Sequence, residues 1–302
     1  MSSTQSSAIA ELQARKRRNL AQTIGAFIVQ KPLGGISGIG IFVVVMMAGL
    51  APLISPYDPA VLHPNEALAS PNRTYLLGTD NAGRDIMSNI IWGSRISLMV
   101  GMGAMAIGVG LGVISGLISG YFEGWVDFTI QRAVDALMAI PTIVLAIAII
   151  AVLGTSATNV ILALAITIIP RTSRLVRGST LSAKQEQYVE AARAIGSGNL
   201  RIMFLHVLPN IFAPILVIAS ITIGGAILSE AALSFLGLGP PPPAPSWGRL
   251  LGGDNTRLMT RAPWVLISPG VAITLTVLAF NLLGDALRDV LDPRLRGTRG
   301  SL

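Results

Sequence analysis

The chain has 302 residues, of which 52% are hydrophobic and only 12% are charged. Soluble domains carry about 25% charged residues, so this composition excludes an ordinary soluble protein and indicates a polytopic membrane protein. The lack of cysteine excludes disulfides and thiolate metal sites, and the net charge of +7 could by itself suggest a nucleic-acid partner.

Six apolar stretches approach or exceed the roughly 20 residues that a helix needs to cross a bilayer. The sequence therefore predicts an all-α membrane protein with six transmembrane helices. The predicted spans are Ile36–Ile54, Ile96–Gly120, Val134–Leu153, Val160–Leu175, Ile211–Leu236 and Pro269–Leu287.

Lysine and arginine predict the orientation of these spans. If the N-terminus lies inside the cell, 16 of the 22 basic residues fall in inside segments, and the other six are Arg73, Arg84, Arg95, Arg249, Arg257 and Arg261. Because short cytoplasmic loops carry the excess of positive charge, both termini are predicted to be cytoplasmic. The net charge is thus a topology signal. No aromatic residues interleave with the basic ones, as a nucleic-acid partner would require.

This topology divides the chain into three parts: a cytoplasmic segment (1–35), a transmembrane domain (36–287) and a cytoplasmic tail (288–302). The transmembrane domain carries two external loops and one long cytoplasmic loop, at residues 55–95, 239–268 and 176–208. In the first part, apolar residues share one helical face, namely Leu20, Ile24, Phe27 and Ile28. They predict either an interfacial helix or an extension of the first span.

A polar stretch, Leu77-Gly78-Thr79-Asp80-Asn81-Ala82-Gly83-Arg84-Asp85, ends the first external loop. Thr79 or Asp80 is a suitable N-cap for a short helix. The apolar residues of that helix, Ile86, Ile90 and Ile91, would rest on the membrane surface.

The second span contains a ladder of small residues at four-residue spacing: Ala104, Gly108, Gly112, Gly116 and Gly120. This spacing puts them in one stripe of a helix, where the lack of side chains lets a neighbouring backbone approach closely. The ladder predicts a tight helix–helix seam rather than scattered membrane glycine. The sequence leaves open whether the partner helix belongs to this chain or to another subunit.

Two acidic residues fall at or within predicted spans, where charge is costly. Asp135 lies near the inner end of the third span, from which it can reach the interface. Glu230 lies nearer the outer end of the fifth span. It is a candidate either for the lining of a translocation path or for structural pairing.

The long cytoplasmic loop holds the sequence Glu190-Ala191-Ala192-Arg193-Ala194-Ile195-Gly196 and continues to His206-Val207-Leu208-Pro209. Leu200, Met203, Phe204, Val207 and Leu208 recur at helical spacing, which predicts a small-residue turn followed by an amphipathic helix. Gly196 permits the turn, and Pro209 is expected to end the helix before the fifth span. A membrane protein with one elaborate loop on one side presents that loop to a partner.

Several chemistries have no support in the sequence. There is no Gly-x-x-x-x-Gly-Lys-Ser/Thr phosphate-binding loop and no His-Glu-x-x-His motif. The two histidines, His63 outside and His206 inside, cannot share a site. No catalytic residue, bound cofactor or metal site is therefore predicted in this chain.

Three motifs together resemble one family. The Glu190–Pro209 loop resembles the coupling loop of bacterial ABC importer permeases. The stretch from Leu77 to Asp85, and Asp292-Pro293-Arg294-Leu295-Arg296-Gly297 in the tail, resemble one subunit type of the dipeptide/oligopeptide (peptide/nickel) importers. That subunit type is the second, C-type, permease of the pair. The resemblance implies a type I ABC importer permease fold in a bacterial inner membrane.

The resemblance also implies partners: a homologous second permease, two ATPase subunits that bind ATP and Mg²⁺, and an external substrate-binding protein. It implies that the ATPase meets the residues Glu190, Ala191, Ala192, Gly196, Leu208 and Pro209. In that role Glu190 would pair with a cation across the interface, while Ala191 and Ala192 would keep the surface flat. Dipeptides, oligopeptides, nickel complexes and glutathione all remain candidate cargoes. An ATPase-independent secondary transporter is the alternative from a different class.

Overall fold

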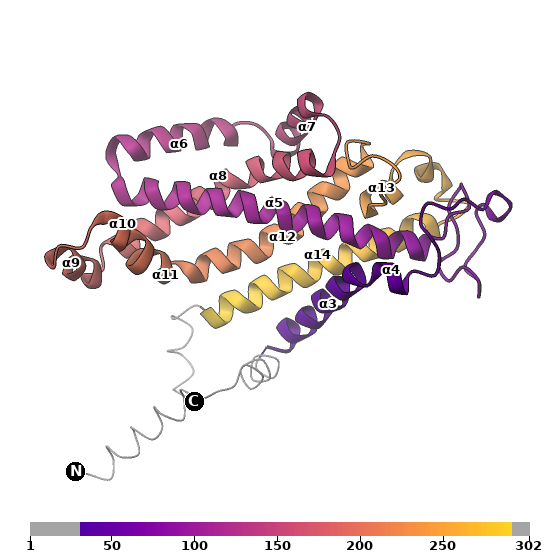
Figure 1. Cartoon of the computed structure of the whole chain (residues 1–302), viewed down its shortest axis with the longest axis horizontal. Coiled ribbons are helices and arrows are strands. Elements are labelled where there is room, and N and C mark those ends of the chain that lie inside the picture. Colours follow the sequence, from indigo (N-terminus) through magenta and orange to yellow (C-terminus); the bar gives the residue numbers. More distant parts are fainter. Residues whose placement is uncertain (1–30, 292–302) are drawn as a thin grey trace, which may run out of the picture.

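The structure is a computed structural model that describes residues 31–291, and this part is mainly helical (Figure 1). Its longer helices are α3 (Pro32–Gly49), α5 (Ile86–Phe122), α6 (Gly124–Met138), α7 (Thr142–Leu153), α8 (Ala157–Lys184), α9 (Gln187–Ala194), α12 (Phe212–Phe235) and α14 (Trp264–Leu291). Shorter elements are α4 (Ala51–Ile54), η1 (Pro64–Glu66), α10 (Asn199–Ile202), the π-helix η2 (Met203–Val207), α11 (Leu208–Asn210), α13 (Trp247–Leu251) and η3 (Gly253–Leu258). The predicted interfacial helix and the Asp292–Gly297 motif lie outside the described residues.

Five of the described helices are long and apolar enough to cross a membrane, namely α3, α5, α8, α12 and α14. The third predicted span, Val134–Leu153, is wrong as a single straight helix. It is the pair α6 and α7, which are bent by 90° at the break between them. The break coincides with Pro141, which lacks a backbone N–H and disfavours helical geometry in the residue before it.

The second span begins ten residues earlier than predicted, and its cap is Asp85 rather than Thr79 or Asp80. The Asp85 carboxylate accepts hydrogen bonds from the backbone N–H of Ser88 at 2.9 Å and from the Ser88 hydroxyl at 2.6 Å. The first turn of α5 is buried within the protein and does not rest on the membrane surface. Asp80 instead folds the preceding loop, where its carboxylate accepts from the backbone N–H groups of Ala82 and Arg84.

The fourth span is also longer than predicted, because α8 continues to Lys184. Residues 176–184 of the predicted cytoplasmic loop are therefore helix, and the loop itself begins at Gln185. Pro170 lies inside α8 without ending it. Pro269 is likewise inside α14, which extends beyond the predicted span at both ends.

The helices form a slab with α5 and α8 side by side near its centre (Figure 1). On one side of this pair lie α12, α14 and α3, and on the other side lie α6 and α7. The segments α9, α10 and α11 gather at one end of the slab, while α4, α13 and the loop between α4 and α5 gather at the opposite end. The two ends that are predicted to face opposite sides of the membrane are thus separated along α5.

The glycine ladder of α5 packs directly against α8, which places its partner within this chain. A methyl group at Gly112 would come within 2.5 Å of the Thr172 Cβ atom, and one at Gly116 within 2.4 Å of the Ser173 carbonyl oxygen. Gly108 and Gly120 are equally close to α8, at 2.7 Å from the Ile168 Cβ atom and 2.8 Å from the Arg177 carbonyl oxygen. The seam between α5 and α8 is therefore a contact of backbone against backbone over about three helical turns.

We expect leucine at Gly112 or Gly116 to force α5 and α8 apart. Overpacking of a close contact costs about 1–3 kcal/mol or more, so the yield and thermal stability of the purified protein should fall for both variants. Gly110→Leu is the matched control, because Gly110 is on the same helix and no heavy atom lies within 4 Å of the place that a Cβ atom would occupy there. Equal stability of Gly112→Leu and Gly110→Leu would contradict a packed seam.

Candidate functional site

The loop between α8 and α12 is fastened to the ends of α5 and α8 by apolar contacts. Its inward-facing residues are fully or almost fully buried: Val189, Ala192, Ile202, Met203 and Val207. They form one cluster with Leu117 and Tyr121 of α5 and with Val176 of α8. The loop is thus a packed extension of the α5–α8 pair, so the two should move together.

Polar contacts reinforce the same junction. The Tyr121 hydroxyl donates to the Asn199 side-chain oxygen at 3.0 Å. The Lys184 ammonium donates to the Tyr121 carbonyl oxygen and to the Glu123 carboxylate, both at 2.6 Å. Burial and the nearby Glu186 carboxylate raise the pKa of the Tyr188 hydroxyl, which keeps the phenol neutral. The hydrogen bonds of Tyr121 and Lys184 hold α10 and the end of α8 to the end of α5.

The outward face of the loop exposes large apolar side chains. The exposed fractions are 83% for Ile195, 67% for Leu200, 61% for Leu205 and 50% for Phe204. We call these four residues the apolar patch. The helical spacing predicts that Leu200 and Phe204 share a face with Met203 and Val207, but the latter two are buried.

The two alanines of the loop motif have different environments. Glu190 and Ala191 are exposed beside the apolar patch, whereas Ala192 is buried against the α5–α8 pair. The expectation that Ala192 helps to flatten an exposed surface is therefore wrong, because its methyl group packs inside the protein. Leu208 is partly buried and Pro209 is exposed.

Gly196 ends α9 in a Schellman motif. Its φ angle is +82°, its N–H donates to the Arg193 carbonyl at 2.9 Å, and the N–H of Ser197 donates to the Ala192 carbonyl at 3.0 Å. A side chain at this position would be strained by the backbone angle alone, since no heavy atom lies within 4 Å of its Cβ position. The turn that the sequence predicted at Gly196 is confirmed.

The helical run after this turn does not stop at Pro209 but continues to Asn210. The π-helix η2 precedes the proline, and the N–H of Leu208 bonds to the carbonyl of Met203, five residues back. In a regular α-helix, the ring of Pro209 would clash with the carbonyl group four residues earlier. The wider π turn shifts the carbonyl groups of the preceding turn, so the helical run can continue past Pro209. The run ends at Ile211, and α12 begins at the next residue, Phe212.

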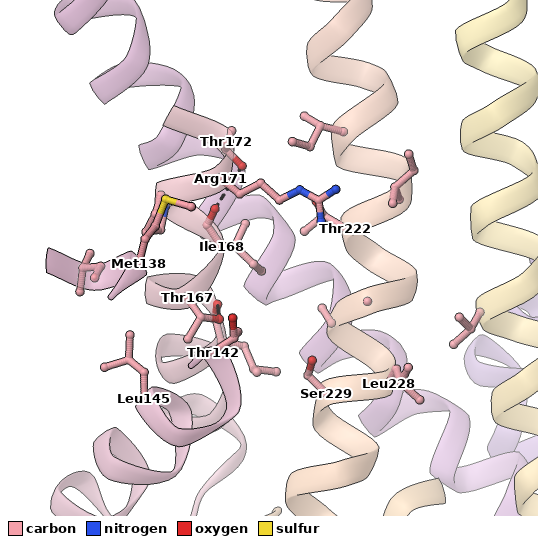
Figure 2. A pocket seen from close by; sticks show the side chains of 18 of the residues that line it. Met138, Thr142, Leu145, Thr167, Ile168, Arg171, Thr172, Thr222, Leu228 and Ser229 are labelled. Atoms are coloured by element: carbon pink, nitrogen blue, oxygen red, sulfur yellow. Dashed lines mark hydrogen bonds between the residues drawn. The ribbon is translucent and has the colours of Figure 1, made fainter. Parts of the chain in front are cut away.

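A second candidate site is a cavity of about 580 Å³ between α8 and α12, closed on one side by the α6–α7 bend (Figure 2). Its lining is apolar with a few hydroxyl and amide groups, namely Thr142, Thr167, Thr172, Thr222, Ser229 and Asn281. One lining residue is charged, Arg171 of α8, and its side chain reaches toward α12 in Figure 2. Small-molecule sites have volumes of about 300–1,000 Å³ and a similar mixture of groups.

Glu230 lies outside this cavity. Its side chain is fully buried, and its carboxylate accepts hydrogen bonds from the Ser97 hydroxyl of α5 at 3.0 Å and the Ser234 hydroxyl of α12 at 2.6 Å. Of the two roles that the sequence left open, these contacts favour structural pairing, here between α5 and α12. Asp135 is paired as well, with the Arg174 guanidinium at 2.6 Å. Across residues 31–291, no three His, Asp or Glu side chains come together as metal ligands.

A family model described as the binding-protein-dependent transport system inner membrane component matches residues 108–297. The chain therefore belongs to this family of inner-membrane permeases. It is the permease subunit of an ABC importer, which excludes the alternative of an ATPase-independent secondary transporter.

The dipeptide transport system permease protein DppC of Alkalihalophilus pseudofirmus is 43% identical over 256 residues, which are 83% of each chain. The glutathione transport system permease protein GsiD of Shigella flexneri is 44% identical over 283 residues, or 93% of this chain and 89% of that one. A solved inward-facing structure of the MetNI methionine ABC transporter has a TM-score of 0.52 and 19% sequence identity. It covers 67% of this chain and 94% of that one, and it supports the type I permease fold alone.

Sequence reasoning missed two features of these sites. Ile195 and Leu205 were not recognised as part of an exposed patch, because helical spacing alone does not tell which face a loop turns outward. The predicted topology assigns Arg171 to the basic residues on the cytoplasmic side, although Arg171 lies within the predicted span Val160–Leu175. A charge within an apolar span was the available signal.

We expect Gly196→Val to loosen the Schellman turn. A left-handed backbone costs an L-residue about 1–2 kcal/mol, so residues 187–210 should exchange their amide hydrogens faster than in the wild-type protein. Gly198→Ala is the matched control, because the φ angle of Gly198 is −69° and its surroundings are open. Unchanged exchange in Gly196→Val would show that the turn does not hold the loop.

Proposed function

We propose that this chain is one of the two permease halves of an importer for dipeptides or oligopeptides. The observation that carries this proposal is the close relation to a protein named as a dipeptide permease, over 83% of both chains. A second, homologous permease would complete the translocation path. An external binding protein would deliver the substrate. Two ATPase subunits would bind ATP and Mg²⁺, for which this chain has no phosphate-binding loop.

Glutathione is the second candidate cargo. A relative named as a glutathione permease is 44% identical over 93% of this chain. Glutathione is itself a tripeptide, so the two candidates share their chemistry. The external binding protein would decide between them.

The apolar patch is the surface that we propose for ATPase docking. Exposed apolar side chains gathered at one end of a membrane protein mark an interaction site. The exposed Glu190 carboxylate forms no ion pair within residues 31–291, so it is free to pair with a cation of the partner. The Schellman turn at Gly196 sets the angle between α9 and the patch.

The packing of the loop suggests how the docked ATPase moves the permease. The loop shares an apolar cluster with the ends of α5 and α8, and the glycine seam joins these two helices along residues 108–120 of α5. When the ATPase subunits close on ATP, a force on the loop would therefore displace α5 and α8 as a unit. The cavity between α8 and α12 would change shape as that unit moves, which gives alternating access.

We expect Leu200→Glu to weaken the association with the ATPase subunits and thereby to lower transport. A charge in the middle of the apolar patch should weaken docking, so fewer ATPase subunits should copurify and uptake should fall by at least about tenfold, the effect of 1.4 kcal/mol. Glu190→Ala should act in the same direction by removing the pairing charge. Met259→Glu is the matched control, since Met259 is also 67% exposed but lies between η3 and α14, outside the loop that joins α8 to α12.

The measurements are copurification of the ATPase subunits and uptake of a labelled dipeptide by cells that carry each variant. Full uptake with ATPase subunits still bound in both Leu200→Glu and Glu190→Ala would contradict the docking surface. Equal loss in Met259→Glu would show that the effect of the charge is not specific to the patch.

We propose that the patch and both termini face the cytoplasm, as the positive charge predicts. Single cysteines can test this in the cysteine-free chain at exposed positions. We expect an impermeant thiol reagent to label Arg73→Cys and Arg257→Cys from outside, but not Gln185→Cys or Glu186→Cys. The reverse pattern would place the docking surface on the wrong side of the membrane for an ATPase.

A further inference from the structure

The cavity between α8 and α12 contains one charged side chain, that of Arg171. Arg171 is the fifteenth of the 28 residues of α8, and it lies toward the inner end of the predicted span Val160–Leu175. Its guanidinium extends across the cavity toward α12 (Figure 2). Within residues 31–291 this guanidinium forms no ion pair.

Two neighbouring arginines of the same helix are paired. Arg174 lies 2.6 Å from the Asp135 carboxylate, and Arg177 binds both oxygens of Asp127 at 2.6 Å. The α6 helix thus supplies an acid for each of these two cations but none for Arg171. Charges inside a membrane are costly, and those that are kept face a cavity or a partner group and mark the paths of substrates.

The rest of the lining shows what kind of ligand this cation suits. Among the described residues no acidic side chain lines the cavity, so none of them neutralises the positive charge there. Hydroxyl and amide groups line the same cavity and can donate to or accept from polar atoms of a ligand. A guanidinium binds a carboxylate through two parallel N–H···O bonds, which are strong where water is scarce.

We infer that Arg171 binds the carboxylate of the substrate while it crosses the membrane. This inference rests on the proposed function, because dipeptides, longer peptides and glutathione all carry a free carboxylate. The cavity of about 580 Å³ is large enough for a small peptide. Arg171 is therefore a substrate-binding residue of the permease itself, distinct from any selection by the external binding protein.

The position of Arg171 also connects substrate binding to the glycine seam. The next residue, Thr172, lines the cavity and lies against Gly112, where a Cβ atom would be only 2.5 Å away. A displacement of the α5–α8 unit therefore moves the Arg171 guanidinium relative to α12. The carboxylate would be held in one arrangement of the helices and released in the other.

The test compares Arg171→Gln, which removes the charge, with Arg171→Lys, which keeps it but loses the planar fork. Arg174→Gln is the matched control, because Arg174 is on the same helix but pairs with Asp135 outside the cavity. Cells that express the complete importer take up labelled Ala-Ala, its C-terminal amide, or glutathione. The binding protein is the same in every strain, so a change in the ratio of acid to amide uptake reports on the permease.

We expect Arg171→Gln to lower uptake of the free acids by at least about tenfold, the effect of one charge-assisted bond, while amide uptake changes little. Arg171→Lys should lie between Arg171→Gln and the wild type, and Arg174→Gln should resemble the wild type. ATPase subunits should copurify with all variants. Unchanged uptake in Arg171→Gln, or an equal loss for acid and amide, would overturn the inference.

Two further outcomes are distinct. Loss of the second permease from purified Arg171→Gln would overturn the inference in favour of an ion pair between subunits. Failure of the wild-type importer to take up any of Ala-Ala, glutathione and a labelled longer peptide would instead refute the proposed function, and the inference with it. The wild-type measurement thus separates the two failures.

Discussion

The close contact between α5 and α8 is the constraint on which the rest of this permease depends. Four glycines of α5 allow the backbones to meet, and the opposing residues of α8 leave no room for even a methyl group at these positions. Because α8 is held this closely, its opposite face carries Arg171 into the cavity at a fixed place. At one end of the same pair, the apolar cluster fastens the loop that bears Glu190 and the apolar patch. One seam therefore positions both candidate sites.

Much of this arrangement could be predicted from the sequence, since the signals are local. Long apolar runs gave the spans, four-residue spacing gave the seam, and Gly196 gave the turn. The prolines show where local rules stop. Pro141 separates α6 from α7, whereas Pro170 and Pro269 lie inside continuous helices. Whether a proline breaks a helix or lies inside it depends on tertiary packing, and the helix-breaking propensity of proline carries no information about that packing.

Burial was the other quantity that the sequence could not supply. Ala191 and Ala192 are chemically identical and adjacent, yet one is exposed and the other packs against α5 and α8. Glu230 could equally have lined a path or paired within the protein. The positions of Ser97 and Ser234, on α5 and α12, favour pairing, and Ser97 is far from Glu230 in sequence. To assign a side chain to the interior or to the surface, one must know how the packed helices are rotated relative to one another. The sequence of a single helix does not specify that rotation.

The length of α5 has a mechanical consequence. Its 37 residues form a rod of about 55 Å, which exceeds the roughly 30 Å of the hydrocarbon layer. One end of α5 belongs to the apolar cluster that holds the loop between α8 and α12. The other end packs beside the Trp247 indole, whose N–H donates to the Ile90 carbonyl oxygen at 2.9 Å. A rod that tilts about its midpoint moves its ends by equal distances in opposite directions. A tilt of about 5° displaces each end of a helix this long by about 2.4 Å. One rigid pivot can therefore widen the passage on one side of the membrane while it narrows the passage on the other.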